Sequence, residues 1–447
     1  MQVIYLESNE APSADTLRRS ASSDAETASA VAKIIAGVRE RGDEALRDYT
    51  REFDNVDVEN TRVMVPDIQA VLRKVDKQVL EALEVAARNI VAFHEQQLER
   101  SWFDSRSDGS LVGSKVTPLD SVGIYVPGGR ALYPSTVLMN ALPARVAGVR
   151  RIAMVSPPQK DGSLDPVLLA AAHIAGVTEV HAVGGAQAIA ALAYGTKKIA
   201  AVDKITGPGN AYVAAAKRQV AGDVGIDMVA GPSEVLILAD ESAEPALVAL
   251  DLMAQAEHDP LAACYLVTTD EELVEEVLEE IDAFMADSPR AEVTRTSLDD
   301  NGIAFVVPDL ATALLAVNTI APEHLEVHMD NPIDLLGLID NAGAIFLGPW
   351  TPESVGDYIA GPNHTLPTGG TARFSSPLST ADFIKRSSVI SYSYTALLKD
   401  APAITALAEK EGLWAHGKAV SARFELLEDD DDDLADDDDA GEGGDKD

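Results

Sequence analysis

Gln255 and His258 lie three residues apart, near the end of a segment (244–257) whose apolar residues have helical spacing. Residues at this spacing share one face of a helix. An imidazole nitrogen and an amide oxygen that lie side by side can bind a divalent cation such as zinc. The same pair is also common on the polar surface of helices, so a metal site requires further ligands from elsewhere in the chain.

Two other groups of polar residues have types suited to proton transfer or ligand binding. Glu323 and His324 come just before a strand-like run, where a turn can bring both side chains to one site as an acid–base pair. Asp357 and His364 fall in a segment rich in glycine and proline, and such loops often carry functional groups. Simple turn chemistry remains the alternative explanation for Asp357.

Two glycine-rich turns each join a strand-like run to a helical segment. They are Gly184-Gly185-Ala186-Gln187 and Gly207-Pro208-Gly209-Asn210. Backbone N–H groups at the start of the following helix can bind the phosphates of a cofactor. Neither turn has the dinucleotide fingerprint G-x-G-x-x-G, so an ordinary strand-to-helix turn remains the alternative interpretation of both.

Strand-like and helical segments alternate over residues 122–220 and again over 234–347. This alternation predicts an α/β fold with parallel, doubly wound sheets, which bind ligands at the carboxyl ends of their strands. The predicted organisation is an N-terminal segment at 1–24, a first α/β domain at 25–115 and 234–375, a second α/β domain at 116–233, a mostly helical C-terminal segment at 376–427, and a disordered acidic tail at 428–447.

The chain is strongly acidic. Its 35 Lys and Arg residues against 73 Asp and Glu residues give a formal charge of −38. Residues 428–447 contribute 1 − 13 = −12 of this charge, so −26 remains on residues 1–427. Such a charge repels nucleic acids and anionic membranes. A dispersed acidic surface also suits a high-salt cytoplasm, which predicts a halophilic, archaeal source; a mesophilic protein that happens to be acidic is the alternative.

The single cysteine, Cys264, lies in an apolar run at 262–267. One cysteine cannot form an intramolecular disulfide, which favours an intracellular location. Its apolar neighbours predict a packing role rather than a nucleophile. No apolar run reaches transmembrane length, and the first residues do not form a signal peptide. We therefore expect a soluble, cytoplasmic protein.

Taken together, the motifs resemble those of the histidinol dehydrogenase family, and they occur in order across almost the entire chain. Each motif alone is unspecific, whereas the complete set is highly specific. The matching residues are Ile124-Tyr125-Val126-Pro127-Gly128-Gly129, Gly184-Gly185-Ala186-Gln187, Gly207-Pro208-Gly209-Asn210, Ala230-Gly231-Pro232-Ser233-Glu234, Gln255-Ala256-Glu257-His258-Asp259, Pro322-Glu323-His324-Leu325, Gly361-Pro362-Asn363-His364 with Leu366-Pro367-Thr368, and Glu411 with His416. Only the acidic tail departs from the family pattern.

The resemblance implies a zinc- and NAD-dependent enzyme that oxidises L-histidinol through L-histidinal to L-histidine, the last steps of histidine biosynthesis. It also implies two incomplete Rossmann-like domains, with 116–233 on the NAD side. A homodimer would exchange its C-terminal segments, so that His416 completes the site of the other subunit. The implied contacts are one zinc ion per subunit on Gln255, His258, Asp357 and His416; catalysis by Glu323 and His324; substrate on Ser233, Glu323, His364, Glu411 and the zinc ligands; and NAD+ on Tyr125, Gln187 and Asn210.

The residue types suit the oxidation of an alcohol to a carboxylate in two hydride transfers. His324 can take the hydroxyl proton because the pKa of an imidazole lies near neutrality. Glu323 can activate the water that the aldehyde must gain. Since Cys264 lies outside every motif, we expect a route through the aldehyde hydrate, without a covalent thiol intermediate. Two other classes remain open: a zinc hydrolase of an imidazole-bearing substrate, and a catalytically inactive acidic binding protein.

Overall fold

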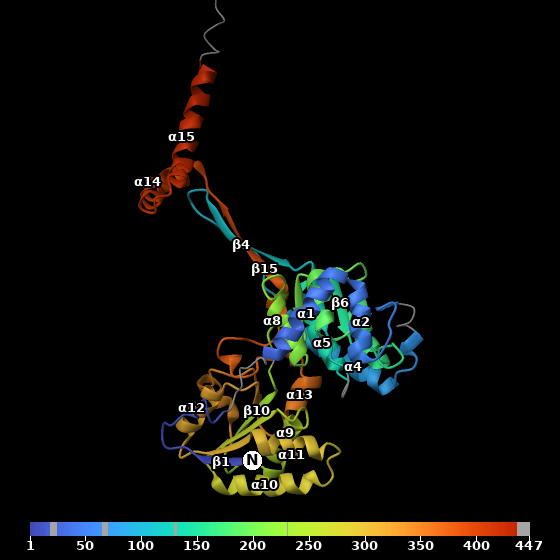
Figure 1. The fold of residues 1–447 in the computed structure, drawn as a ribbon. Coiled ribbons are helices and arrows are strands. Elements are labelled where there is room, and N and C mark those ends of the chain that lie inside the picture. Colours follow the sequence, from blue (N-terminus) through green and yellow to red (C-terminus); the bar gives the residue numbers. More distant parts are fainter. Residues whose placement is uncertain (18–24, 65–69, 129–131, 230, 436–447) are drawn as a thin grey trace, which may run out of the picture. The chain divides into compact units, whose positions relative to one another are not determined.

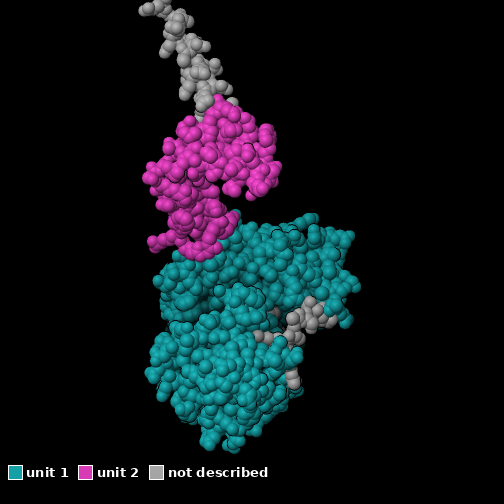
Figure 2. Space-filling model, turned by 90° about the vertical axis from the view of Figure 1, so that its left-hand side faces the viewer, with its two compact units in different colours: residues 1–98, 118–384 teal, residues 99–117, 385–447 magenta. Residues whose placement is uncertain are grey.

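The computed structural model describes residues 1–17, 25–64, 70–128, 132–229 and 231–435. The chain divides into two compact units (Figure 2), residues 1–98 with 118–384 and residues 99–117 with 385–447. Within the described residues, unit 1 contains two six-stranded sheets, and unit 2 contains a three-stranded sheet with two helices. No helix of the described residues is long and apolar enough to span a bilayer.

The first sheet of unit 1, called sheet A here, is parallel throughout and has the strand order β1-β12-β11-β10-β13-β14. Figure 1 labels its strands β1 and β10. Alternate side chains of β10 face opposite cores: Leu236 packs with α12, whereas Val235 packs with α9, α10 and α11. Helices on both faces explain the continuous apolar runs in these strands. The elements are β1 (Gln2–Tyr5), β10 (Glu234–Ala239), α9 (Pro245–Ala256), β11 (Ala263–Thr268), α10 (Glu271–Met285), α11 (Ala291–Asn301), β12 (Gly302–Val306), α12 (Leu310–Ile320), β13 (His324–His328), β14 (Ala344–Leu347) and the short α13 (Glu353–Tyr358).

The second sheet of unit 1, sheet B, has the order β2-β7-β6-β5-β8-β9 and is parallel except for β2, which pairs antiparallel with β7. Ile152 of β6 packs with α4, α5 and α6, and its neighbour Ala153 packs with α1, α2, α7 and α8 on the other face. The elements are α1 (Ala25–Arg41), α2 (Asp43–Asp54), β2 (Arg62–Val63), α4 (Lys77–Glu95), β5 (Ser121–Tyr125), α5 (Pro134–Ala147), β6 (Arg151–Ser156), α6 (Pro166–Ala175), β7 (Glu179–Ala182), α7 (Gly185–Tyr194), β8 (Lys204–Thr206), α8 (Ala211–Val220) and β9 (Gly225–Ile226).

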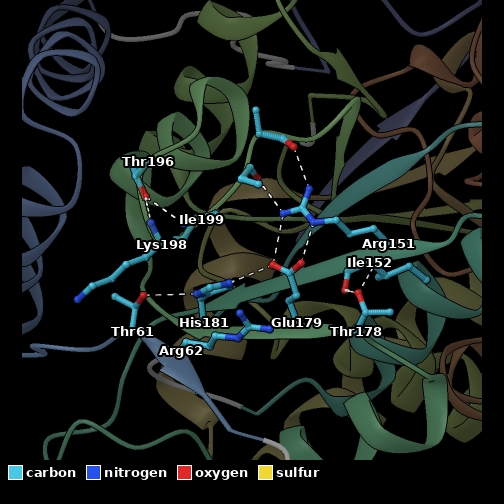
Figure 3. A network of polar contacts seen from close by, with 12 residues as sticks. Thr61, Arg62, Arg151, Ile152, Thr178, Glu179, His181, Thr196, Lys198 and Ile199 are labelled. Carbon is cyan, nitrogen blue, oxygen red and sulfur yellow. Dashed lines mark hydrogen bonds and ion pairs between the residues drawn. The ribbon is translucent and has the colours of Figure 1, made fainter.

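A polar network ties together the amino ends of two strands of sheet B (Figure 3). Arg151, the first residue of β6, donates to the Glu179 carboxylate of β7 at 2.8 Å and to the Ala201 carbonyl at 2.8 Å. Glu179 lies 3.5 Å from Nε2 of His181, whose Nδ1 lies 3.4 Å from the Thr61 hydroxyl. The network therefore fixes the edge of sheet B that lies opposite the glycine-rich turns.

Unit 2 consists of β3 (Trp102–Ser105), β4 (Leu111–Pro118) and β15 (Ile384–Ser391) in the sheet order β15-β4-β3, followed by α14 (Tyr394–Lys410) and α15 (Trp414–Ala435). The strands β3 and β4 are antiparallel neighbours. At the start of α14, the Ser393 side chain accepts a hydrogen bond from the Ala396 N–H, which is the expected cap for a helix after a strand.

The structure confirms the α/β fold with parallel sheets. The helices at 25–95, however, pack against sheet B and not, as the sequence suggests, against sheet A. They were expected to join residues 234–375, whereas α1 packs on α7 and α8, α4 packs on α5, and β2 pairs with β7. The apolar face of α1, with Val31 and Ile35, completes the core of sheet B. The N-terminal segment also contributes a strand, because β1 pairs with β12 at the edge of sheet A. Residues 18–24 lie outside the described residues.

The C-terminal region differs from the sequence expectation in two places. Residues 384–391 form the strand β15 inside the segment expected to be helical, because β4 offers a free edge to pair with. The helix α15 continues to Ala435, so the expectation of disorder from residue 428 is wrong for 428–435. Extending an existing helix costs much less than starting one, which explains how acidic residues can continue it. The rest of the acidic tail, 436–447, lies outside the described residues.

Candidate active site

The end of α9 positions the first candidate pair. Gln255 is fully buried in the last turn of α9, and His258 follows just after the helix and is exposed. The His258 N–H donates to the Gln255 carbonyl at 3.2 Å, which continues the helical turn far enough to keep the two residues on one side. Helix α9 leads from β10 to the parallel strand β11, so its carboxyl end lies at the amino edge of sheet A.

Glu323 and His324 lie at this same amino edge, where β13 begins. Ala321 ends α12 in the left-handed region (φ 47°) and turns the chain into Pro322. The Glu323 carboxylate accepts a hydrogen bond of 2.9 Å from the N–H of Glu234 on the neighbouring strand β10. The catalytic candidates therefore lie at the amino ends of sheet A, not at the carboxyl ends that the fold class alone predicts.

His324 is held by contacts on one ring nitrogen only. Its Nδ1 lies 3.2 Å from the Glu234 carbonyl oxygen and 3.0 Å from the Gln255 side-chain amide. Its Nε2 is buried and has no hydrogen-bond partner among the described residues. Burial lowers the pKa of His324 to about 4. A neutral ring with Nδ1–H donating to the Glu234 carbonyl leaves the Nε2 lone pair available as a base.

Asp357 and Glu353 extend toward this cluster from α13, four residues apart and therefore on one helix face. The potential ligand atoms of His258, Glu353 and Asp357 all lie within 4.8 Å of one another. Glu353 is buried, and its carboxylate lies 3.8 Å from Nδ1 of His324. Glu353 was not singled out in the sequence, although its four-residue spacing from Asp357 is a signal that could have found it.

Electrostatics in this cluster are dominated by buried carboxyl groups. Burial raises the pKa of Glu353 well above its usual range, and the negative charges of Asp357 and Glu323 raise it further. Burial likewise raises the pKa of Glu323 well above its usual range, although the Glu234 N–H and the Ser233 hydroxyl oppose the shift by hydrogen bonding. Such a concentration of like charges is relieved by protonation or by a bound cation.

The side-chain oxygen of Gln255 accepts a hydrogen bond from Nδ1–H of His324 at 3.0 Å. Turning the amide over would bring its nitrogen to 3.3 Å from the Glu353 carboxylate and 3.2 Å from the Glu234 carbonyl, but it would also place two donors 3.0 Å apart at Nδ1, so this orientation is incompatible with the Nδ1–H tautomer. Burial lowers the pKa of His364, which lies 3.7 Å from Asp357. A cavity of about 630 Å³ lies beside the cluster, and its lining includes His324, Asp357 and His364. The cluster can therefore contact a small molecule.

The candidate cofactor residues lie at the carboxyl ends of strands in sheet B. The hydroxyl of Tyr125, at the end of β5, accepts a 3.1 Å hydrogen bond from the N–H of Gly185 at the start of α7. Gln187 is buried in the first turn of α7, and neither atom of its amide has a partner among the described residues. The Asn210 side chain caps α8 by accepting from the Tyr212 N–H at 3.1 Å. The structure therefore places these three side chains at the glycine-rich turns.

A buried ion pair fixes the second glycine-rich turn. Gly207 has φ 110°, and a Cβ atom there would clash with the Tyr125 carbonyl, so only glycine fits. Lys217 forms an ion pair with Asp227 and donates to the Gly207 carbonyl at 2.9 Å. Asp227 in turn accepts from the Gly207 N–H at 2.8 Å. Sequence reasoning missed both Lys217 and Asp227, because no spacing rule links a residue of α8 to one after β9.

The last two site candidates, Glu411 and His416, belong to unit 2. Glu411 caps the end of α14, and His416 lies in the first turn of α15. Both side chains are exposed. Among the described residues, neither is part of a group of metal-binding side chains in one chain.

Cys264 is buried in β11, and burial raises the pKa of its thiol to about 12. Its Sγ donates to the Leu252 carbonyl at 3.4 Å, so the thiol packs against α9. We expect Cys264→Ser to keep most of the activity, with a loss of stability of about 1–2 kcal/mol because a hydroxyl replaces sulfur in an apolar site. Steady-state turnover and thermal unfolding measure the two effects. A folded variant without turnover would contradict a packing role.

Comparison with known proteins identifies the family. The model of the family described as histidinol dehydrogenase matches residues 17–424. A histidinol dehydrogenase from Halalkalibacterium halodurans is 54% identical over 396 residues, 89% of this chain and 93% of that protein. One from Bacillus cereus is 52% identical over 427 residues, 95% of this chain and 99% of that protein. A crystal structure of histidinol dehydrogenase from Elizabethkingia anophelis superposes with a TM-score of 0.89 at 35% identity, covering 96% of this chain and 99% of that one.

Halalkalibacterium halodurans and Bacillus cereus are Bacillus-like organisms, and these relatives of the chain lend no support to the archaeal source that the acidic charge predicts. The match extends from the first helix of sheet B to α15 and includes every candidate residue described above. The chain belongs to the histidinol dehydrogenase family, whose members are NAD-dependent oxidoreductases.

Proposed function

We propose that the protein oxidises L-histidinol through L-histidinal to L-histidine, with two NAD+ as hydride acceptors and one zinc ion per subunit. The observation that carries this proposal is the cluster around His324, in which a neutral buried imidazole, several carboxyl groups and a glutamine amide lie beside one cavity. A biosynthetic enzyme of this kind would work in the cytoplasm, and the charge of −38 supports the absence of nucleic-acid or membrane partners.

The residues proposed to hold zinc are Gln255, His258 and Asp357, with His416 from a second subunit. Their chemistry fits the ion, because imidazole nitrogen and carboxylate oxygen are its usual non-thiol ligands, and the Gln255 amide offers a further oxygen donor. The close approach of His258 and Asp357 and the excess of buried acidic groups around them support a divalent cation here. When bound, zinc supplies a positive charge that anchors the substrate's nitrogen atoms and polarises its oxygen.

His324 is proposed as the base of the first oxidation. Its Nε2 takes the hydroxyl proton of histidinol while the hydride leaves the adjacent carbon for NAD+, which yields the aldehyde, NADH and a protonated imidazole. The Glu234 carbonyl, 3.2 Å from Nδ1, supports this role because it fixes the ring orientation and the tautomer. Burial of the ring excludes bulk water from the proton transfer.

Glu323 is proposed as the base that activates water for the second oxidation. It takes one proton from water as the oxygen bonds to the aldehyde carbon, and the resulting hydrate loses a hydride to the second NAD+. Burial favours the protonated form of Glu323, and the N–H of Glu234, at 2.9 Å, opposes that effect by stabilising the carboxylate form that this step requires. The buried thiol of Cys264, with its pKa of about 12, supports a route without a covalent thiol intermediate.

The NAD+ molecules are proposed to bind at the carboxyl ends of sheet B, against Tyr125, Gln187 and Asn210. Parallel α/β sheets bind ligands at this edge, beside helix amino ends. The unpartnered amide of Gln187 supports the position, since a buried amide without hydrogen bonds is costly unless a ligand supplies them.

A homodimer is proposed to complete each site, with Ser233, His364 and Glu411 as further substrate contacts. Unit 2 exposes large apolar side chains, which supports contact with another chain. They are Trp102, Phe103, Ile390, Leu407 and Trp414, the last 76% exposed. The dispersed charge of −26 on residues 1–427 also supports a surface adapted to high salt.

The test is an assay of NADH absorbance when histidinol is added to the protein with NAD+. We expect two NADH for each histidinol consumed, loss of turnover after treatment with a chelator, and recovery when zinc is returned. A zinc hydrolase would respond to the chelator but produce no NADH, and an inactive binding protein would show neither response. NADH formation that survives complete zinc removal would contradict the proposed cofactor.

A further inference from the structure

Helix α13, which carries Glu353 and Asp357, has no side-chain cap of its own. It begins after Pro352 and comprises only six residues, so it cannot be stable in isolation. The missing cap comes from another element: the carboxylate of Glu326, on β13, accepts a 2.8 Å hydrogen bond from the Glu353 N–H. A carboxyl group at the amino end of a helix also interacts favourably with the helix dipole.

Glu326 is itself held by His328 and Asp251. Nε2 of His328 lies 3.2 Å from the Glu326 carboxylate and 3.4 Å from that of Asp251, on α9. Glu326 and His328 are both buried. Although burial opposes the charge on His328, hydrogen bonds to Asp251 and Glu326 raise its pKa to about 9. The imidazolium therefore bridges two carboxyl groups and fixes the orientation of Glu326.

The strand period joins this group to the candidate active site. Leu325 and Val327 point to the α12 face of sheet A, so His324, Glu326 and His328 share the opposite face of β13. The same face receives α9, which contributes Gln255 beside His324 and Asp251 beside His328. The strand β13 and the helix α9 thus carry both the contact of His324 with Gln255 and the contact of His328 with Asp251.

We propose that Glu326, His328 and Asp251 form a positioning triad that clamps the amino end of α13 and thereby sets the distance of Asp357 from His258. This inference rests on the proposed zinc site. Asp357 lies one helical turn beyond the clamped N–H of Glu353, so a shift or fraying of the first turn moves the carboxylate that would bind zinc. Groups that orient metal ligands commonly change metal affinity by about 10–100-fold when removed.

The three side chains of the triad also have the composition of a metal site, since their potential ligand atoms lie within 4.8 Å of one another. Both carboxyl groups, however, are within hydrogen-bonding distance of the same nitrogen, Nε2 of His328. The imidazole proton therefore occupies the place that a cation would take. The hydrogen bonds from His328 to Glu326 and Asp251 therefore explain this cluster without a second metal ion.

The test measures zinc affinity by titrating metal-free protein, alongside thermal unfolding and the separate values of kcat and KM for histidinol. Glu326→Ala removes the hydrogen-bond acceptor, and we expect its zinc Kd to rise at least about 10-fold. Glu326→Gln keeps an oxygen that can accept from the Glu353 N–H, and we expect its zinc Kd to stay within about 3-fold of wild type, a free-energy difference below about 0.7 kcal/mol. In Glu326→Ala, the fold increase in KM should exceed the fold decrease in kcat.

A matched control exists in sheet B, where Glu179 and His181 have the same two-residue spacing on β7, with 3.5 Å between their side chains (Figure 3). Glu179→Ala should lower the unfolding temperature without changing zinc affinity. If Glu326→Ala does not fold, Asp251→Asn replaces it, because Asp251 is partly exposed and its loss still weakens the clamp.

Three results would overturn the triad: a folded Glu326→Ala or Asp251→Asn variant that binds zinc as wild type does, a Glu326→Gln variant as weak as Glu326→Ala, or a second zinc ion in wild type that the Glu326 variants lose. Failure of the proposed function is separate from these results, because then wild type itself would bind no zinc. If wild type binds zinc and the variants bind it with unchanged affinity, only the proposed positioning triad is rejected, and the proposed zinc site stands.

Discussion

His324→Ala is expected to lower kcat by about 10²–10⁴-fold, the usual contribution of a positioned general base. The variant removes Nε2, which has no protein partner among the described residues, and leaves the proposed zinc ligands in place. Zinc content and thermal unfolding should therefore stay close to wild type. Steady-state kinetics with NAD+ and histidinol, together with metal analysis, measure the change. A variant that loses zinc in parallel with activity would show that His324 acts on the metal site instead.

Glu323→Gln provides the comparison, because it should separate the two oxidations. The amide cannot take a proton from water, so oxidation of added histidinal should slow more than oxidation of histidinol to histidinal. The glutamine oxygen can still accept a hydrogen bond from the Glu234 N–H, so the local structure where β13 begins beside β10 should be preserved. Equal slowing with both substrates would contradict the water-activating role.

The second large effect is expected from mixed dimers of two inactive variants. His258 belongs to unit 1 and His416 to unit 2, and we propose that they meet in one zinc site built from two subunits. His258→Ala and His416→Ala should each be inactive. A heterodimer of the two would carry one site with both lesions and one intact site, so its activity should recover toward half that of wild type.

Heterodimers purified with two different affinity tags make this measurement direct, and zinc analysis interprets it. One zinc ion per heterodimer with restored turnover supports the shared site. A heterodimer without zinc would show that both ligands come from one chain. A mixture of His258→Ala with itself, refolded in the same way, controls for activity recovered by refolding alone.

Several features of this protein follow from local sequence patterns. The alternation of apolar runs predicts the parallel strands and their covering helices, because the inner strands of sheets A and B are buried on two faces. The turns at Gly184 and Gly207 are readable because a close approach or a positive φ admits only glycine there. The packing role of Cys264 follows from its apolar neighbours. The order of family motifs along the chain was sufficient to predict the family.

The partner of each apolar face was not readable in the same way. An amphipathic helix such as α1 shows which side it buries but not which sheet covers that side, so the sequence predicts the wrong sheet for residues 25–95. The strand conformation of β15 is likewise not predictable from local sequence, since it depends on pairing with the edge of β4. Tertiary contacts override local preference in such segments.

The sequence alone therefore determined most of the secondary-structure classes, the glycine turns and the identity of most candidate site residues, because each depends on neighbours within a few positions. Only the tertiary structure decided how they meet. The pairing of β10 with β13 sets Val235 opposite His324 and so brings Glu234 to His324 and Glu323. Glu353 acquires its role through the tertiary packing of α13, which brings it to Glu326 and His324 on β13. These contacts join residues 27 or more positions apart, so no local sequence pattern fixes those distances.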